Sequence, residues 1–277
     1  MPRLRLITCI AALLLSGFAH ASDNTAKRAL VVAYYDFPPL SYTDANLQAT
    51  GAAINLVRRL GERAGYPLTF RQLPSARVYQ GLLDGSIDIW PGALGKPELA
   101  DHVLPSRAMM GHTELNLYRR PGTLAPRLPD DLRNREIILI QGYTYWQTAT
   151  ALLGDPQLKV RPHTTSSHES ALRMLFKERG DYLLDYSAPV NAARQALQLP
   201  ELPHTTLYRL DLSIIFSRLA PGAEQIRDDF DQAYIALLAA GELQDELTAM
   251  GINADAPLPS PAPPAGSPAN SASGNAP

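Results

Sequence analysis

Residues 79–95, YQGLLDGSIDIWPGALG, have the pattern of a helix end, a turn and a buried strand. A helical pattern ends at Leu83, an Asp-Gly turn signal follows, and the apolar run 87–90 stops at Pro91. We expect a loop to begin there, at the carboxyl end of a strand. Open α/β sheets bind their ligands at such strand ends, so the sequence places a candidate site at residues 90–93.

A related arrangement returns in residues 172–186, LRMLFKERGDYLLDY. An amphipathic helix ends near Gly180, and Asp181 leads into the apolar run 182–184. Aligning the two stretches sets Gly92 opposite Asp185. Two lobes, each presenting a strand end to a shared cleft, would explain this repetition.

The remaining segments continue the alternation of strands and helices. Expected strands are 29–35, 68–73, 87–90, 113–118, 137–141, 160–163, 182–184 and 207–217, and expected helices are 51–64, 78–83, 145–153, 166–179, 189–197 and 223–250, the last broken at Gly241. Residues 74–77 and 92–105 are expected loops. This order predicts an α/β fold with mainly parallel sheets flanked by helices.

Both ends of the chain differ from this pattern. Arg3 and Arg5 precede the apolar run 6–15, and a small-x-small sequence ends at Ala21, so residues 1–21 are predicted to be a signal peptide. The only cysteine, Cys9, lies within the apolar run, and no lipid-acceptor cysteine follows it. Residues 255–277 are mostly Pro, Ala, Ser, Gly and Asn and are expected to be a disordered tail.

The composition limits the partners of the exported chain. Without Arg3 and Arg5, 23 basic residues accompany 27 acidic ones, and the basic residues form no run interleaved with aromatics. We therefore expect no nucleic-acid partner. We also expect the exported protein to be a monomer. The five histidines after residue 21 lie at no familiar metal-ligand spacing, and phosphate-binding and hydrolase motifs do not occur, so we expect no metal and no cofactor.

Five short motifs, in this order, resemble the periplasmic solute-binding proteins of the polar amino acid type, the bacterial extracellular solute-binding protein family 3. They are DFPPL at 36–40 before a Gly51-led helix, LDGSID at 83–88, QGYT at 141–144, Asp185, and GEL at 241–243. The resemblance covers about residues 30–251. It implies a two-lobed periplasmic binding protein fold of type II, a periplasmic location, and delivery of a solute to an ABC permease.

The resemblance also implies lobe limits and a hinge. One lobe would comprise residues 22–117 and 211–254, the other residues 118–210, with hinges near 116–119 and 209–213. In this family an arginine after the central loop usually binds the carboxylate of an amino acid. Leu99 or Ala100 stands at that position here.

Candidate charged and polar ligand contacts follow from these positions. Asp185 could pair with a ligand ammonium, or could cap the helix that follows. Thr144 could supply helix N-terminal donors to an anion, or act as a plain N-cap. Arg77 is the first substitute for the missing arginine, because it follows a strand at the carboxyl edge of the sheet. Arg107 is the second substitute and Lys96 the third.

Aromatic residues could form the walls of the cleft. Tyr35, Phe37 and Trp90 belong to the first lobe and Tyr143 to the second, while Gly92 and Ala93 would form the loop between the walls. Plain core packing is the alternative role, above all for Trp90.

Three functions are compatible with these residues. The first is capture of a small polar solute without turnover. The second, which the resemblance implies because a few relatives of the family are dehydratases, is an enzyme acting on cyclic dienyl acids, for which Glu114 and Glu169 are possible acids. The third is a sensory partner that presents its ligand to a membrane receptor.

Overall fold

The computed structural model describes residues 27–252 of the chain. The predicted signal peptide and the predicted tail lie outside the described residues. Within them, none of the helices combines the length and apolar composition that a membrane crossing requires.

The fold is α/β, as predicted, with eight strands in one continuous sheet in the order β4-β1-β5-β10-β6-β9-β7-β8. These strands are β1 (Leu30–Tyr34), β4 (Leu68–Gln72), β5 (Ile89–Ala93), β6 (Val103–Tyr118), β7 (Glu136–Ile140), β8 (Arg161–Thr165), β9 (Tyr182–Tyr186) and β10 (His204–Ser217). Two short strands, β2 (Tyr42–Thr43) and β3 (Ala49–Thr50), pair with each other apart from the sheet. The helices are α1 (Ala52–Ala64), α2 (Ser75–Asp84), α3 (Gln147–Gly154), α4 (His168–Phe176), α5 (Ser187–Ala196), α6 (Ala223–Ala239) and α7 (Gln244–Ala249).

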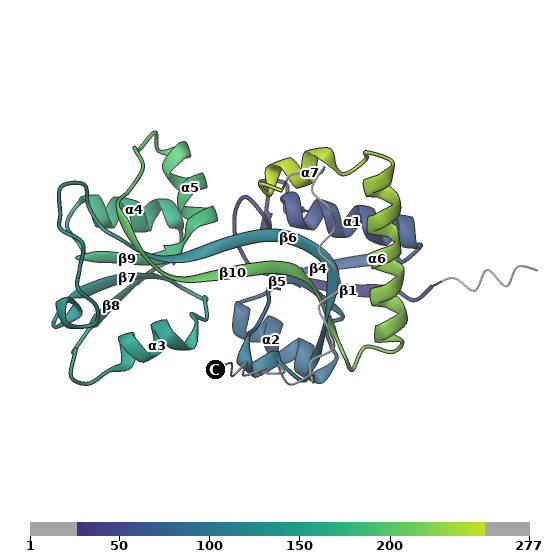
Figure 1. Ribbon diagram of the computed structural model, residues 1–277, viewed down its shortest axis with the longest axis horizontal. Coiled ribbons are helices and arrows are strands. Elements are labelled where there is room, and N and C mark those ends of the chain that lie inside the picture. Colours follow the sequence, from purple (N-terminus) through teal and green to yellow (C-terminus); the bar gives the residue numbers. More distant parts are fainter. Residues whose placement is uncertain (1–26, 253–277) are drawn as a thin grey trace, which may run out of the picture.

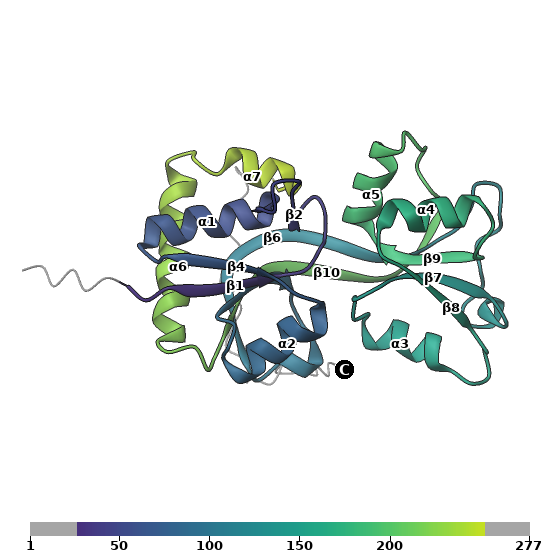
Figure 2. The same ribbon diagram turned by 180° about the vertical axis from the view of Figure 1, so that it is seen from behind.

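The sheet is shared by two lobes, which Figures 1 and 2 show side by side. The first lobe contains the parallel strands β1, β4 and β5 with α1, α2, α6 and α7, and the second contains the parallel strands β7, β8 and β9 with α3, α4 and α5. Helices cover both faces of the sheet in each lobe. This arrangement matches a two-lobed periplasmic binding protein.

Strands β6 and β10 run through both lobes as one antiparallel pair (Figure 1). Their pairing extends from His204 opposite Tyr118 to Ser217 opposite Val103. The predicted lobe limits at 117/118 and 210/211 therefore fall within β6 and β10. Within residues 27–252, these two strands are the sheet segments that a relative movement of the lobes would have to bend.

Several predicted element limits were wrong. The expected loop at Pro91 and Gly92 is part of β5, which pairs with β10 along its whole length. Proline is tolerated at position 91 because β1 pairs with β5 at Ile89 alone. On the side of β5 that faces β1, Pro91 therefore has no ladder hydrogen bond to supply. Arg77 lies in the first turn of α2, not in a loop, because the helix begins at Ser75.

The first half of β6 was also missed, since residues 103–105 were expected to be the end of a loop and residues 106–112 were assigned to no element. Two irregularities in register interrupt the pairing of this half with β10. One lies between Asp211 and Ser213 of β10 and the other between Ser213 and Ile215. Gly111, at φ 84°, supplies the left-handed conformation within the first of these bulges.

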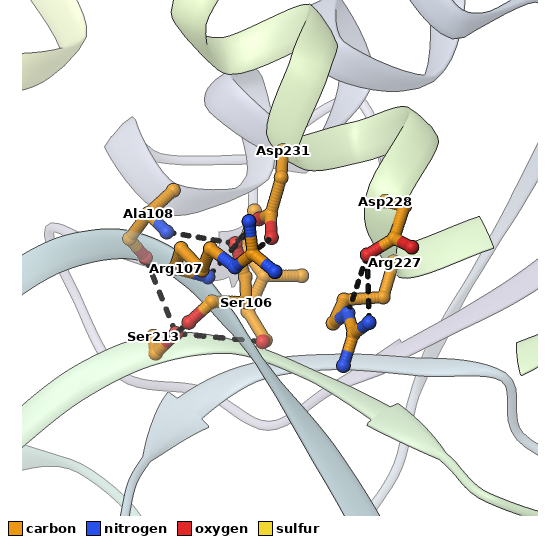
Figure 3. Close-up of polar contacts among 8 residues, drawn as sticks. Ser106, Arg107, Ala108, Ser213, Arg227, Asp228 and Asp231 are labelled. Carbon is orange, nitrogen blue, oxygen red and sulfur yellow. Dashed lines mark hydrogen bonds and ion pairs between the residues drawn. The ribbon is translucent and has the colours of Figure 1, made fainter. Parts of the chain in front are cut away.

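Asp231 of α6 fixes the second bulge to the helix layer (Figure 3). Its carboxylate accepts hydrogen bonds from the Ser106 hydroxyl and, at 3.0 Å, from the Arg107 N–H. Ser213 of β10 donates to the backbone oxygens of Ser106 and Ala108 at 3.1 and 3.2 Å. Backbone N–H and C=O groups that leave the ladder at this bulge thus form hydrogen bonds with the side chains of Asp231 and Ser213.

Candidate functional site

Two cavities lie where the lobes meet. The inner cavity, of about 30 Å³, lies against β6 and β10, and the outer cavity, of about 270 Å³, lies beyond it. Residues of the first lobe that line the inner cavity include Tyr35, Phe37, Gly92, Ala93 and Lys96, and those of the second include Trp146 and Tyr186. The outer cavity is lined by Tyr35, Asp36, Gln72, Tyr143, Ser166 and His168, among others. Each cavity thus draws its walls from both lobes.

The predicted aromatic walls are present, except for Trp90. Tyr35 and Phe37 line the inner cavity and contact the rings of the second lobe. The Phe37 ring is stacked on Tyr143 at 6.1 Å between centroids and tilted against Tyr186 at 5.4 Å. Trp90 is only 1% exposed and packs behind this wall against Tyr79.

The phenols of this cluster are held in their neutral form. Burial raises the pKa of Tyr35, of Tyr143 and of Tyr186 well above the ordinary value of 10.0, and neighbouring phenols and Asp185 add to the effect. The walls therefore present uncharged rings with hydroxyl groups at their edges.

Ser75 joins the lobes through the loop before α3. The Thr144 N–H donates to the Ser75 Oγ at 2.9 Å, and the Ser75 hydroxyl donates to the backbone oxygen of Gly142, also at 2.9 Å. The Ser75 N–H donates to the same oxygen at 3.2 Å. Thr144 was predicted to offer its donors to a ligand. In this arrangement its N–H binds the other lobe instead.

Lys96 is a buried cation beside the inner cavity. Lys96 is only 4% exposed, and its Nζ donates a hydrogen bond to the backbone oxygen of Thr144 at 3.1 Å. The same Nζ lies 5.1 Å from the ring centroid of Tyr79 and 4.9 Å from that of Trp146. Burial lowers the pKa of Lys96, and the nearby Glu98 opposes this shift. No carboxylate within residues 27–252 forms an ion pair with this ammonium.

Asp185 is fully buried and does not present a free carboxylate to either cavity. Its Oδ2 lies 2.7 Å from the Nδ1 of His168, and its Oδ1 accepts the Tyr186 N–H at 2.7 Å. The reason is positional, because Asp185 lies within β9, one residue before the strand's end, and α4 places His168 against it.

His168 continues this chain of hydrogen bonds into the first lobe. Its Nε2 lies 3.1 Å from the Tyr143 hydroxyl, which donates to the backbone oxygen of Asp36 at 2.7 Å. The carbonyl can only accept, so the single phenol proton is used there and Nε2–H must donate to Tyr143. Nδ1–H donates to the Asp185 carboxylate. With both ring nitrogens donating, the contacts of His168 are those of the protonated imidazole.

The electrostatics of His168 agree with this assignment. Burial alone would lower the pKa of His168, but the charge of Asp185 and the hydrogen bond to it outweigh burial, and Asp36 and Glu169 act in the same direction. The pKa of His168 is raised above 6.5 as a result. The pair neutralises itself, so the second lobe has no uncompensated acid behind the aromatic wall.

The remaining predicted residues are distributed as follows. Gly92 and Ala93 line the inner cavity as residues of β5. Arg77 is exposed on α2 and lines neither cavity, and Arg107 is exposed on β6 at the far end of the first lobe. Sequence reasoning ranked Lys96 last among the basic candidates and assigned no role to Ser75 or His168. No pattern in the sequence marks these three, because their contacts come from the other lobe or from another element.

The described part of the chain contains no cluster of three or more His, Cys, Asp or Glu side chains that could hold a metal ion. The side chains described above give the site its chemistry: aromatic rings, hydroxyl groups, Asp36, Lys96 and the His168–Asp185 pair.

Comparisons with known proteins agree with this geometry. Among solved structures, the P235GK mutant of ArgBP from T. maritima has a TM-score of 0.64 at 17% identity, over 81% of this chain and 95% of that one. A histidine kinase sensor domain with similarity to periplasmic binding proteins has a TM-score of 0.64 at 19% identity, over 80% and 96%. The substrate binding protein of an amino acid ABC transporter has a TM-score of 0.60 at 13% identity, over 80% and 97%.

At these identities the likeness shows the shared fold. No curated protein matches the chain. The sequence profile of the bacterial extracellular solute-binding proteins, family 3, matches residues 30–248. That match spans most of the chain and all the elements that build the two lobes and their cavities, and so the chain belongs to the bacterial extracellular solute-binding proteins of family 3.

Proposed function

We propose that the protein captures a small solute between its two lobes in the periplasm and delivers it, unchanged, to an ABC permease in the inner membrane. The observation that carries the proposal is the pair of cavities walled by both lobes, with β6 and β10 alone in the sheet connecting them. Membership of an extracellular solute-binding family supports a periplasmic location. The similarity to the substrate binding protein of an ABC transporter supports the permease as partner.

Closure of the lobes is part of this proposal. The inner cavity, at about 30 Å³, holds no more than a water molecule or two, so a solute of amino-acid size enters only when the lobes separate. The contacts from Ser75 to Gly142 and Thr144, from Lys96 to Thr144 and from Tyr143 to Asp36 would break on opening. Closure on a solute would restore those of them that the enlarged inner cavity allows. We expect a monomer throughout.

Capture without turnover is favoured over a dehydratase reaction by the positions of Glu114 and Glu169, the two acids that the sequence offered for that reaction. Glu114 lines a separate cavity between β6 and α5, and Glu169 lines neither cavity between the lobes. A turnover assay with a cyclic dienyl acid tests this part, and formation of an aromatic product would contradict it.

The binding function is tested by a thermal-shift screen of amino acids, polyamines, small carboxylates and aromatic acids. A ligand at about one hundred times its Kd stabilises the folded protein by roughly 2.7 kcal/mol and raises its Tm. The proposal fails if no member of these classes raises the Tm and none is detected by calorimetry.

A further inference from the structure

Of the charges that the described residues place around the two cavities, the cation Lys96 has no counter-charge, whereas the acid Asp185 has one. This difference bears on the class of solute. Lys96 has its ammonium out of water, with one hydrogen bond to a backbone oxygen and two aromatic faces beside it. An ammonium carries three donors, so two remain free for a partner. A buried cation without an anion is costly, and an anionic ligand would remove that cost.

The acid that a ligand ammonium would need is not free. Asp185 is 0% exposed, both of its oxygens accept hydrogen bonds, and its charge is balanced by the His168 imidazolium. Asp36 is the remaining carboxylate along the described cavity walls. It lies at the outer cavity and is exposed, where water weakens any ion pair.

The space beside Lys96 is walled by rings and apolar side chains. Tyr35, Phe37, Trp146 and Tyr186 contribute rings, and Leu210 and Leu212 of β10 form the back of the inner cavity. Such walls favour a flat apolar body stacked between rings. A charged amino group next to the ligand carboxylate would be buried among them without a partner.

We infer that the solute is a small aromatic or planar carboxylate that carries no amino group, with its carboxylate bound to Lys96. This rests on the proposed function, because it assigns the solute class of that same site. The His168–Asp185 pair sets the specificity. His168 neutralises the charge of Asp185, and so removes the negative charge that would recognise the ammonium of an α-amino acid.

The test compares three compounds with one phenyl body on the exported full-length protein: 3-phenylpropanoate, L-phenylalanine and 2-phenylethylamine. Calorimetric titration should show that 3-phenylpropanoate binds at least about tenfold more tightly than L-phenylalanine, and that 2-phenylethylamine does not bind. Tighter binding of L-phenylalanine or of the amine would overturn the inference.

Variants locate the effect on named side chains. Lys96→Met should lose at least about tenfold in affinity for 3-phenylpropanoate, and its ligand-free Tm should rise, because a buried charge without a partner has been removed. The rise in Tm shows that the variant folds. Arg77→Gln, which changes an exposed basic residue of the same lobe, should leave the affinity unchanged. Full affinity in Lys96→Met would overturn the assignment.

The His168→Gln variant tests the second half of the inference. Glutamine can donate to Asp185 but carries no charge, so the negative charge of the carboxylate is no longer compensated and would attract a ligand ammonium. The preference for 3-phenylpropanoate over L-phenylalanine should fall by about tenfold or more. An unchanged preference would contradict the role given to the pair.

Failure of this inference is distinguishable from failure of the proposed function. If L-amino acids bind more tightly than all carboxylates and Lys96→Met behaves as wild type, solute capture stands and the solute class is wrong. If no compound of the full screen binds, both are wrong.

Discussion

Ser75 and Thr144 lie in different lobes and are joined by a hydrogen bond in which the Thr144 N–H donates to the Ser75 Oγ at 2.9 Å. Both residues are next to the N-terminal turns of helices, α2 in the first lobe and α3 in the second. The Ser75 N–H, a free donor at the start of α2, also binds the other lobe, because it donates to the Gly142 oxygen at 3.2 Å. A single hydroxyl accounts for contacts with both Gly142 and Thr144.

Replacing this hydroxyl should weaken closure. Ser75→Ala leaves the Thr144 N–H and the Gly142 oxygen with fewer partners in the closed state, while both are hydrated in an open state. We expect a loss of about 1 kcal/mol in closure, or roughly fivefold in solute affinity, with little change in Tm of the ligand-free protein. Calorimetry with the screened solute measures it. Ser86→Ala, at an exposed serine of the same lobe, is the control, and equal affinities for both variants would contradict the prediction.

The His168–Asp185 pair predicts a pH dependence of stability. The folded-state pKa of His168 is raised above its ordinary 6.5, so the pair's contribution is fully present below about pH 6.5 and is lost as the pH rises through the folded-state pKa. The charged groups facing His168 are Asp185 on β9, Asp36 from the first lobe and Glu169 on α4. The Tm should therefore fall as the pH is raised from about 6 to about 9.

The His168→Gln variant supplies the comparison for this pH series. Its Tm should be lower than that of the wild type at about pH 6, and the difference between the two proteins should shrink as the pH rises. A difference that stays constant over this range would show that His168 does not change its protonation there. The difference between the two proteins isolates the contribution of His168.

How far the sequence predicts the fold is clearest in the strands. Short apolar runs such as 137–141 and 182–184 predicted β7 and β9, since a buried parallel strand needs apolar side chains on both faces. The first half of β6 was not predicted, because Pro105 and Gly111 are typical of loops. They are tolerated where bulges interrupt the ladder, and that depends on β10, which is distant in sequence.

The candidate site was predictable to the extent that it lies at strand ends. Tyr35 and Phe37 were predicted from their position just after β1, and both line the inner cavity. Lys96 could not be ranked from sequence, because its burial depends on Tyr79 of one lobe and Trp146 of the other. The pairing of His168 with Asp185 likewise depends on the packing of α4 on β9.

The bulge at Gly111 predicts a difference between two glycine positions. Gly111→Ala places a Cβ 3.1 Å from the Met250 oxygen at φ +84°, whereas Gly122→Ala has φ +82° and meets nothing within 4 Å. Both variants should lose about 1–3 kcal/mol from backbone strain, and Gly111→Ala should lose more because its neighbour is backbone. Urea unfolding measures both. A smaller loss for Gly111→Ala would mean that Met250 moves freely away from β6.

The last prediction concerns Asp231, which is 5% exposed and connects α6 to the second bulge of β6 (Figure 3). Asp231→Ala removes the acceptor of the Arg107 N–H and of the Ser106 hydroxyl, and Ser106 in turn accepts the Ala108 N–H at 2.9 Å. Each buried group left unpaired costs about 1–3 kcal/mol, so the free energy of unfolding should fall by about 2 kcal/mol or more.

Figure 3 also provides the matched control, Asp228 of the same helix. It pairs with the adjacent Arg227 at 2.7 Å with its side chain 44% exposed, so Asp228→Ala should change the free energy of unfolding by less than about 1 kcal/mol. Neither aspartate lines a cavity between the lobes, and solute affinity should be unchanged in both variants. Urea unfolding and calorimetry of the two proteins decide the matter. If Asp231→Ala were as stable as Asp228→Ala, the bulge would be held by Ser213 and the β6–β10 ladder alone. If Asp231→Ala folded normally but bound the solute more weakly, the bulge would take part in closing the lobes.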